Sequence, residues 1–89
     1  MTKNEFNDLY DSLNYGHDVD LVIEEQRFFL EWNKNGLTIY KMQGDTGSEI
    51  VTLQGENHDV IVKKLFDFCF LAEKSLNKSY QEISILDIE

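Results

Sequence analysis

The stretch that decides the fold is Asp18–Leu53, DVDLVIEEQRFFLEWNKNGLTIYKMQGDTGSEIVTL. Within it, apolar and polar residues alternate in successive short runs, which is typical of β-strands with one buried face. Turn sequences separate the runs, so the pattern predicts three successive antiparallel hairpins that form one four-stranded sheet. The expected strands are Asp18–Glu24, Arg27–Asn33, Leu37–Gln43 and Glu49–Leu53.

The three turns differ in how well their residues suit them. Lys34-Asn35-Gly36 is a strong turn sequence, because Asn and Gly tolerate positive φ angles. Gly44-Asp45-Thr46-Gly47 is expected to form the last turn, and Glu25-Gln26 the first, although Glu25-Gln26 lacks the Gly or Asn that tight hairpins favour. The turns fix the register, and a slip of one residue would exchange the two faces of the sheet.

The two faces of the predicted sheet have different compositions. One carries two apolar sets and is expected to be buried: Val19, Leu21, Ile23 and Phe28, Leu30, Trp32. The other combines acidic side chains with apolar ones: Asp18, Asp20, Glu24, Glu31, Val22, Phe29, Tyr40 and Met42. This second face therefore has no explanation in terms of the core.

Helices are predicted on either side of the sheet. Thr2-Lys3-Asn4-Glu5 is a capping box, and apolar residues at helical spacing follow it, which predicts a helix over residues 3–14 with Gly16 after its end. Asn57 is expected to cap a second helix with an apolar stripe of Ile61, Leu65, Phe68 and Ala72, and Lys74–Lys78 is expected to be a connection. Ser79–Glu82 repeats the capping-box pattern, whereas Ile83, Ile85 and Ile88 alternate imperfectly, so residues 79–89 are compatible with a helical turn or a strand.

These elements predict one α+β domain over residues 1–89. It comprises an N-terminal helix, a four-stranded antiparallel meander and a C-terminal helix, with both helices on the Val19/Phe28 face. The chain has 89 residues, of which 42% are hydrophobic and 12% aromatic, enough to form one packed core.

Charge is unevenly distributed along the chain, which has a net charge of −9. Residues 1–25 hold seven acids against Lys3, residues 26–78 are neutral, and residues 79–89 add three acids. Because like charges repel, direct binding to nucleic acid or to an anionic membrane is not expected. A protein partner with a basic surface is compatible with this charge, as is a simple role of the acids in solubility.

Neither a catalytic nor a metal-binding motif is recognisable. His17 and His58 each precede an aspartate, but neither has the spacing of a metal site, and each falls at the boundary of an element. Cys69 lies on an apolar stripe, which favours a buried thiol over a nucleophile. Asp18 and Asp20 are neighbours on one face, but catalytic carboxylates need a pocket that shifts a pKa. The expectation is a non-enzymatic protein without a cofactor or metal.

The single cysteine excludes a disulfide within the chain, and neither a signal peptide nor a membrane-spanning run is present. A cytoplasmic location is therefore expected.

Gly16-His17-Asp18-Val19-Asp20-Leu21, then Gln26-Arg27-Phe28-Phe29-Leu30-Glu31-Trp32, and finally Asn77–Ile83 form a recognisable succession. It resembles small acidic uncharacterised α+β proteins of Gram-positive bacteria and their phages and mobile elements. The chain departs from that pattern at Glu24-Glu25, where the pattern has Asn-Gly. The resemblance implies an intracellular α+β protein and no particular chemistry.

The mixed sheet face is the candidate working surface. An apolar centre inside a charged border is typical of protein interfaces, and the candidate partner-binding residues are Asp18, Asp20, Glu24, Phe29, Glu31 and Tyr40. The hypothesis is a protein-binding module, such as an acidic inhibitor or immunity-type protein that occupies a basic surface of its target. Four alternatives stay open: the C-terminal segment covers this face, a second copy covers it in a homodimer, the face is simply exposed, or a hydrolase or metal site lies near His17 or His58.

Overall fold

The structure, a computed structural model, describes residues 1–71 and 74–89. Helix α1 (Lys3–Asn14) is followed by strands β1 (Val19–Ile23), β2 (Gln26–Asn33), β3 (Gly36–Gln43) and β4 (Thr46–Leu53). Helix α2 (His58–Asp67) comes next, then the short strands β5 (Cys69–Leu71) and β6 (Lys74–Ser75), helix α3 (Leu76–Ser79), a 3₁₀ turn at Tyr80–Glu82 and strand β7 (Ile83–Ile88). The predicted α+β class and the three successive hairpins are confirmed.

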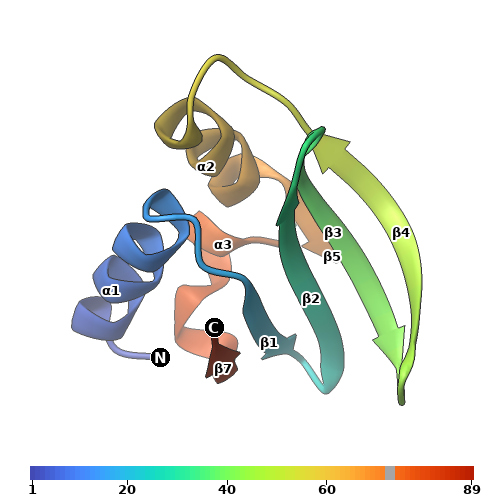
Figure 1. The fold of residues 1–89 in the computed structure, drawn as a ribbon. Coiled ribbons are helices and arrows are strands. Elements are labelled where there is room, and N and C mark those ends of the chain that lie inside the picture. Colours follow the sequence, from blue (N-terminus) through green and yellow to red (C-terminus); the bar gives the residue numbers. More distant parts are fainter. Residues whose placement is uncertain (72–73) are drawn as a thin grey trace.

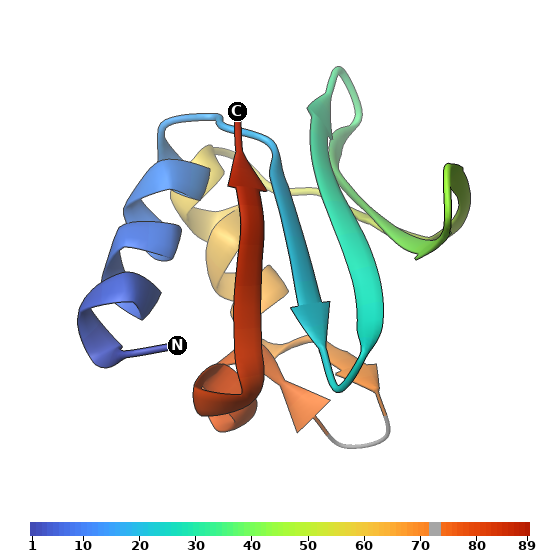
Figure 2. The ribbon, with the colours of Figure 1, turned by 90° about the horizontal axis from the view of Figure 1, so that it is seen from below.

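The main sheet has five strands, so the prediction of a four-stranded meander was incomplete. Its order is β4-β3-β2-β1-β7, and each neighbouring pair is antiparallel. The C-terminal strand returns to lie along β1, as Figure 2 shows most directly. Residues 79–89 thus contain both a helical turn and a strand, and they extend the sheet at its edge.

A β-bulge explains why the alternation in the last strand looked imperfect. Ile85 is opposite Leu21, but Asp87 is opposite Asp20, so Leu86 is an extra residue without a partner in β1. A bulge of this kind shifts the face of every residue that follows it. Ile83, Ile85 and Ile88 therefore reach the same side of the sheet despite their irregular spacing.

The two longer helices begin where the sequence predicted. Thr2 and Glu5 form the predicted capping box of α1, and Asn57 accepts a hydrogen bond from the Val60 amide at the start of α2. However, α2 ends at Asp67 and Phe68 is already extended, so the expected apolar stripe beyond it was wrong, and Ala72 lies outside the described residues. The stretch Lys74–Lys78, predicted to be a connection, contains β6 and most of α3. Among the described residues, no helix combines the length and apolar character needed to cross a membrane.

The reason for the early end of α2 lies in the packing of the segment that follows. Phe70 on β5 is buried and places its ring edge-on against Phe28, with the ring centroids 5.1 Å apart. An extended segment brings Phe70 to the buried face of the main sheet, where its ring packs in the core. Tertiary packing thus overrides the helical pattern of the sequence.

The first hairpin turn is Glu24-Glu25, one residue earlier than predicted. Both residues have positive φ, at 49° and 67°, as a tight hairpin turn of the type favoured by Asn-Gly requires. The prediction followed the residue preferences of such turns, and the chain instead accepts strain at two glutamates. The last turn contains Gly44 and Asp45 alone, so β4 begins at Thr46 rather than Glu49.

The core lies between the sheet and the helices, and the predicted buried face is confirmed. Figure 1 shows α1 and α2 on the same side of the sheet. Val19, Leu21, Ile23, Phe28 and Leu30 on the sheet are fully buried, and they pack with a set from the helices that comprises Leu9, Leu13, Ile61, Val62, Leu65 and Phe66. Trp32 packs on the edge of this core and is only partly buried. The helices leave the opposite face, here called the outer face, uncovered.

Candidate interaction surface

One row of side chains crosses the outer face from edge to edge. The ladder places Asp87 opposite Asp20, Asp20 opposite Phe29, Phe29 opposite Tyr40, and Tyr40 opposite Glu49. Directly opposite residues of antiparallel strands point to the same face. The row therefore has two aromatic rings at its centre, with two aspartates on one side and one glutamate on the other, and it spans all five strands.

The two aromatic rings form the centre of a shallow hollow. Phe29 and Tyr40 stack with their centroids 6.4 Å apart and their planes at 29°. Together with Glu31, Met42 and Gly47 they line a cavity of about 220 Å³. Gly47 packs closely against Met42, because a Cβ atom there would lie 2.8 Å from the Met42 Sδ. We call these five residues the aromatic hollow.

Two β-bulges bring acids onto this face. In β4 the register shifts between Val51 and Glu49, so Ile50 is an extra residue and Glu49 points to the outer face instead of following Val51 and Leu53. In β7 the extra residue is Leu86, and Asp87 reaches the outer face in the same way. Ile50 and Leu86 are 42% and 55% exposed, which places apolar side chains at both edges of the sheet.

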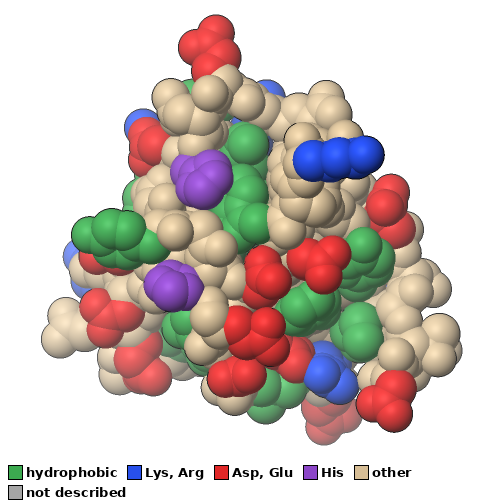
Figure 3. Space-filling model, in the orientation of Figure 1, with side chains coloured by type: hydrophobic (Ala, Val, Ile, Leu, Met, Phe, Trp, Pro, Cys, Tyr) green, Lys and Arg blue, Asp and Glu red, His purple; other side chains and the backbone are tan. Residues whose placement is uncertain are grey.

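The charges on the outer face are only partly compensated. Arg27 Nε donates to both carboxylate oxygens of Asp20 at 2.8 and 3.1 Å, and its Nη1 also donates to the Gly44 carbonyl. The hydrogen bonds to Asp20, then the charge of Asp20, raise the pKa of the Arg27 guanidinium. Glu31, Glu49 and Asp87 have no hydrogen-bond or ion-pair partner among the described residues. In the view of Figure 3, acidic side chains surround hydrophobic ones over the strands.

The structure brings most of the predicted partner-binding residues together. Asp20, Phe29 and Tyr40 share one row, and Glu31 lies in the neighbouring row opposite Thr38. Asp18 precedes β1, and its Oδ1 accepts a hydrogen bond from the Trp32 amide at 2.8 Å, so this acid has a structural role. Glu24 lies in the β1–β2 turn, beyond the row. Glu49 and Asp87 were missed by the sequence prediction because the bulges that orient them leave no regular pattern.

The C-terminal segment does not cover the outer face. One alternative held that residues 79–89 fold over it, but β7 pairs edge to edge with β1 instead. Phe29, Tyr40 and Met42 stay partly exposed. Within residues 1–71 and 74–89, the two longer helices lie on the other side of the main sheet, as Figure 1 shows.

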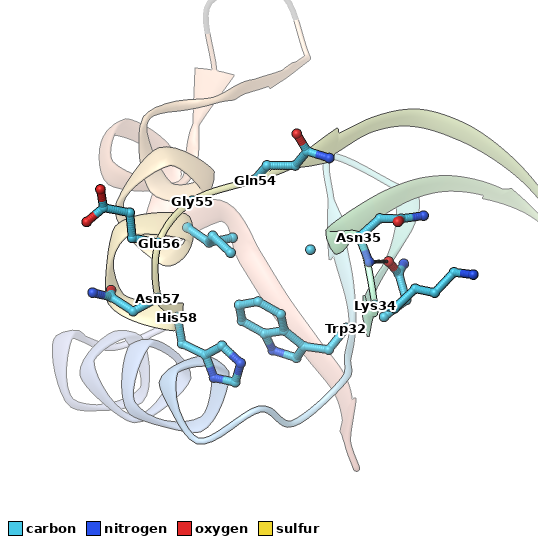
Figure 4. A pocket seen from close by; sticks show the side chains of 11 residues that line it. Trp32, Lys34, Asn35, Gln54, Gly55, Glu56, Asn57 and His58 are labelled. Carbon is cyan, nitrogen blue, oxygen red and sulfur yellow. Dashed lines mark hydrogen bonds between the residues drawn. The ribbon is translucent and has the colours of Figure 1, made fainter.

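A second, larger cavity lies at the other end of the sheet, beside His58. Its volume is about 440 Å³, and the β2–β3 turn and the β4–α2 loop form its walls. The rings of Trp32 and His58 stack there with centroids 4.1 Å apart, and the Trp32 Nε1 is buried without a hydrogen-bond partner in the described part of the chain. Figure 4 shows the side chains of Lys34 and Glu56 directed away from this second cavity, so these two charged lining residues do not converge on one point.

Each of the two histidines contacts a backbone carbonyl oxygen through its ring. His58 Nδ1 lies 3.0 Å from the Asn14 carbonyl oxygen and links the end of α1 to the start of α2. His17 Nδ1 contacts the carbonyl oxygen of Glu89. Among the described residues, no group of three or more His, Cys, Asp or Glu side chains is arranged to hold a metal ion. The side chain of Cys69, predicted to be a buried thiol, lies outside the described part of the structure.

Comparisons with protein families, curated proteins and solved structures found no match to this chain. What the fold and the surface define is a small α+β domain whose sheet is covered by helices on one face and presents aromatic and acidic side chains on the other.

Proposed function

We propose that this protein is a non-enzymatic protein-binding module that uses the outer face to occupy a basic surface of its target, as an acidic inhibitor or immunity-type protein would. The observation that carries the proposal is the Asp87–Asp20–Phe29–Tyr40–Glu49 row. Aromatic residues at the centre of an interface supply most of its binding energy when water is excluded from them. Charged residues at the rim steer a partner of opposite charge and select it.

The energetics of the free protein also favour a protein-binding function for the outer face. The aromatic rings are only partly buried, so burying them further would be favourable, and the uncompensated acids on one face repel each other, which reduces the stability of the isolated chain. A basic partner would bury the rings and neutralise the acids, so binding would gain apolar burial and relieve the repulsion.

Differential capture tests the proposal. Wild-type protein and two variants are immobilised at low salt and exposed to a lysate of the native cell. Phe29→Thr/Tyr40→Thr removes the aromatic centre while keeping residues of high β-propensity. The control Tyr15→Thr removes an aromatic ring that is 83% exposed at the end of α1, outside the sheet. We expect one protein to be retained by wild type and the control, and to bind the double variant about 30-fold more weakly once purified.

A second pair of variants tests the charges. Glu49→Gln/Asp87→Asn and Asp8→Asn/Glu56→Gln each remove two negative charges, but only the first pair removes them from the outer face. The first pair is expected to weaken binding more, and the difference is expected to shrink as salt is added. Equal retention by all variants, or no retained protein, would contradict the proposal.

The homodimer makes a different prediction. Sedimentation of the wild-type protein should give a monomer, whereas a dimer that Phe29→Thr/Tyr40→Thr dissociates would show that a second copy occupies the outer face. That result would replace the heterologous partner with self-association.

The cavity beside His58 favours a second candidate function, the binding or hydrolysis of a small molecule. Its volume is within the range of ligand pockets. Trp32 is the single tryptophan of the chain, so its fluorescence reports on this cavity. The test screens a library of metabolites and esters. A compound that changes this fluorescence in wild type but not in His58→Ala would support the second candidate. An unchanged signal across the library would exclude it.

A further inference from the structure

The aromatic hollow has a composition that suits one kind of side chain. Two stacked aromatic rings, a thioether and a carboxylate line it, and no basic residue is among its lining residues. Aromatic faces attract cations through their π-electrons, and a carboxylate adds charge and hydrogen-bond acceptors. The basic residue nearest in register, Arg27 opposite Met42, is held by Asp20.

Glu31 is the acceptor available to an incoming group. Its position opposite Thr38 on the outer face puts it in the row next to Phe29 and Tyr40. Thr38 is satisfied elsewhere, since its hydroxyl accepts from Asn33 Nδ2 at 2.8 Å and lies 2.8 Å from the Thr52 hydroxyl. In the described part of the chain the Glu31 carboxylate has no partner of its own. It therefore keeps its hydrogen-bonding capacity for a ligand.

We infer that the aromatic hollow is an anchor site for one arginine side chain of a protein partner. The guanidinium would stack on the Phe29 or Tyr40 ring and form two hydrogen bonds with the Glu31 carboxylate. A planar guanidinium can do both at once, whereas the compact ammonium of lysine matches a carboxylate less well and cannot stack in the same way. The cavity of about 220 Å³ has room for this group and for part of its aliphatic stem.

This inference rests on the proposed function, since it names the residue by which the partner is held. It also gives a role to Gly47, where a Cβ atom would lie 2.8 Å from the Met42 Sδ, so that Met42, which lines the hollow, would have to shift. The general acidity of the protein would attract many basic surfaces. The hollow would select those that present an arginine.

The test uses NMR titration of the full chain with three short probes: Ac-Gly-Arg-Gly-NH₂, its citrulline analogue and its lysine analogue. Citrulline has the shape of arginine without the charge. The arginine probe is expected to shift the signals of Phe29, Glu31, Tyr40 and Met42, and to bind roughly fivefold or more tightly than either analogue. Equal signal shifts with the citrulline or lysine probe, or shifts spread over the acids of α1, would overturn the inference.

Variants then locate the site. Glu31→Gln and Glu49→Gln remove one charge each from the same face, but only Glu31 lines the hollow. Binding of the arginine probe should weaken roughly fivefold in Glu31→Gln and less than about twofold in Glu49→Gln. Gly47→Ala is expected to weaken it as well, by moving Met42. Equal effects of the two glutamine variants would contradict the anchor.

Failure of the anchor and failure of the proposed function give different results. If the captured partner depends on Phe29 and Tyr40 but not on Glu31, the interaction surface stands and the arginine anchor is wrong. If the arginine probe binds selectively but no partner is captured, the hollow binds arginine, but the proposed function and the assignment of that arginine to a protein partner are wrong.

Discussion

Phe29 on β2 and Tyr40 on β3 lie directly opposite each other on the outer face, and their rings stack with centroids 6.4 Å apart. Such a cross-strand aromatic pair stabilises a sheet by up to about 1 kcal/mol. Packing within the sheet thus accounts for their contact with each other but not for the acids on both sides. Since a bulge in each edge strand is needed to place Glu49 and Asp87 there, the acidic border depends on specific irregularities of the backbone.

The β7 bulge predicts an unusual tolerance to deletion. Because Leu86 has no partner in β1, its removal should leave Ile85 opposite Leu21 and Asp87 opposite Asp20. The deletion is expected to change the free energy of unfolding by less than about 1 kcal/mol in urea denaturation. Deleting Val22, which is paired on both sides within the regular part of β1, should unfold the protein because it reverses the faces of that strand. An unfolded Leu86 deletion would contradict the register described for β7.

Asp20 and Asp87 form a like-charged cross-strand pair, which Arg27 relieves from one side only. Asp87→Asn should therefore stabilise the fold, by roughly 0.2–1 kcal/mol at low salt. The gain should fall as sodium chloride screens the repulsion. Glu56→Gln, in an exposed loop, serves as the charge-matched control and should have a smaller effect. A loss of stability in Asp87→Asn would show that the aspartate has a favourable partner.

The strained β1–β2 turn predicts a stabilising substitution. Glu25 has a φ of 67°, which costs a residue with a side chain about 1 kcal/mol relative to glycine. Glu25→Gly should raise the free energy of unfolding by about that amount in urea denaturation. Asp45→Gly places glycine in another hairpin turn, at a residue without positive φ, and should be neutral or destabilising. If both variants behave alike, strain at Glu25 is not the cause.

The contact between α1 and α2 predicts a pH dependence. Tyr10 Oη donates to Asp59 Oδ1 at 2.6 Å, and Lys63 Nζ lies 2.9 Å from Asp59 Oδ2. The Tyr10 hydrogen bond, then the Lys63 one, lowers the pKa of Asp59 below its ordinary value of 3.8, and the same Tyr10–Asp59 bond raises the pKa of Tyr10 above 10.0. A lowered carboxyl pKa stabilises the fold above pH 3.8 and ceases to do so as the pH falls through the folded-state pKa.

The corresponding measurement compares wild type with Asp59→Asn by urea denaturation between pH 7 and pH 2. Wild type should be the more stable at pH 7, and the difference should shrink as the pH falls below about 3.8. For Tyr10 the sign is opposite, because its pKa is raised. Its contribution to the free energy of unfolding is present below pH 10 and should be lost as the pH rises through its folded-state pKa. A difference that stays constant between pH 7 and pH 2 would show that Asp59 acts through packing rather than charge.

Local sequence patterns were sufficient for the elements whose determinants are local. The Thr2/Glu5 capping box predicted the start of α1, and strict alternation in β1 and β2 predicted the buried face. The fifth strand was left open as one of two alternatives for residues 79–89, because its bulge at Leu86 breaks the alternation. Helix α2 was extended too far because Phe70 packs on Phe28, a contact between distant residues. The first turn was misplaced because Glu24 and Glu25 adopt angles that their residue type disfavours.

The candidate surface could be predicted at its centre and not at its border. Phe29, Tyr40 and Glu31 follow from the parity of regular strands. Glu49 and Asp87 depend on the bulges at Ile50 and Leu86, and the hollow depends on the way Met42 lies against Gly47. These features arise from pairing and packing across the sheet, which a linear pattern does not contain.

The most direct test of the outer face as the working surface is an NMR cross-saturation measurement on the complex with the protein that wild type retains and Phe29→Thr/Tyr40→Thr loses. Saturation is expected to pass from the partner to residues around Phe29, Tyr40 and Met42 and to fade toward the helices. Saturation confined to α1, or to the cavity beside Trp32 and His58, would contradict it.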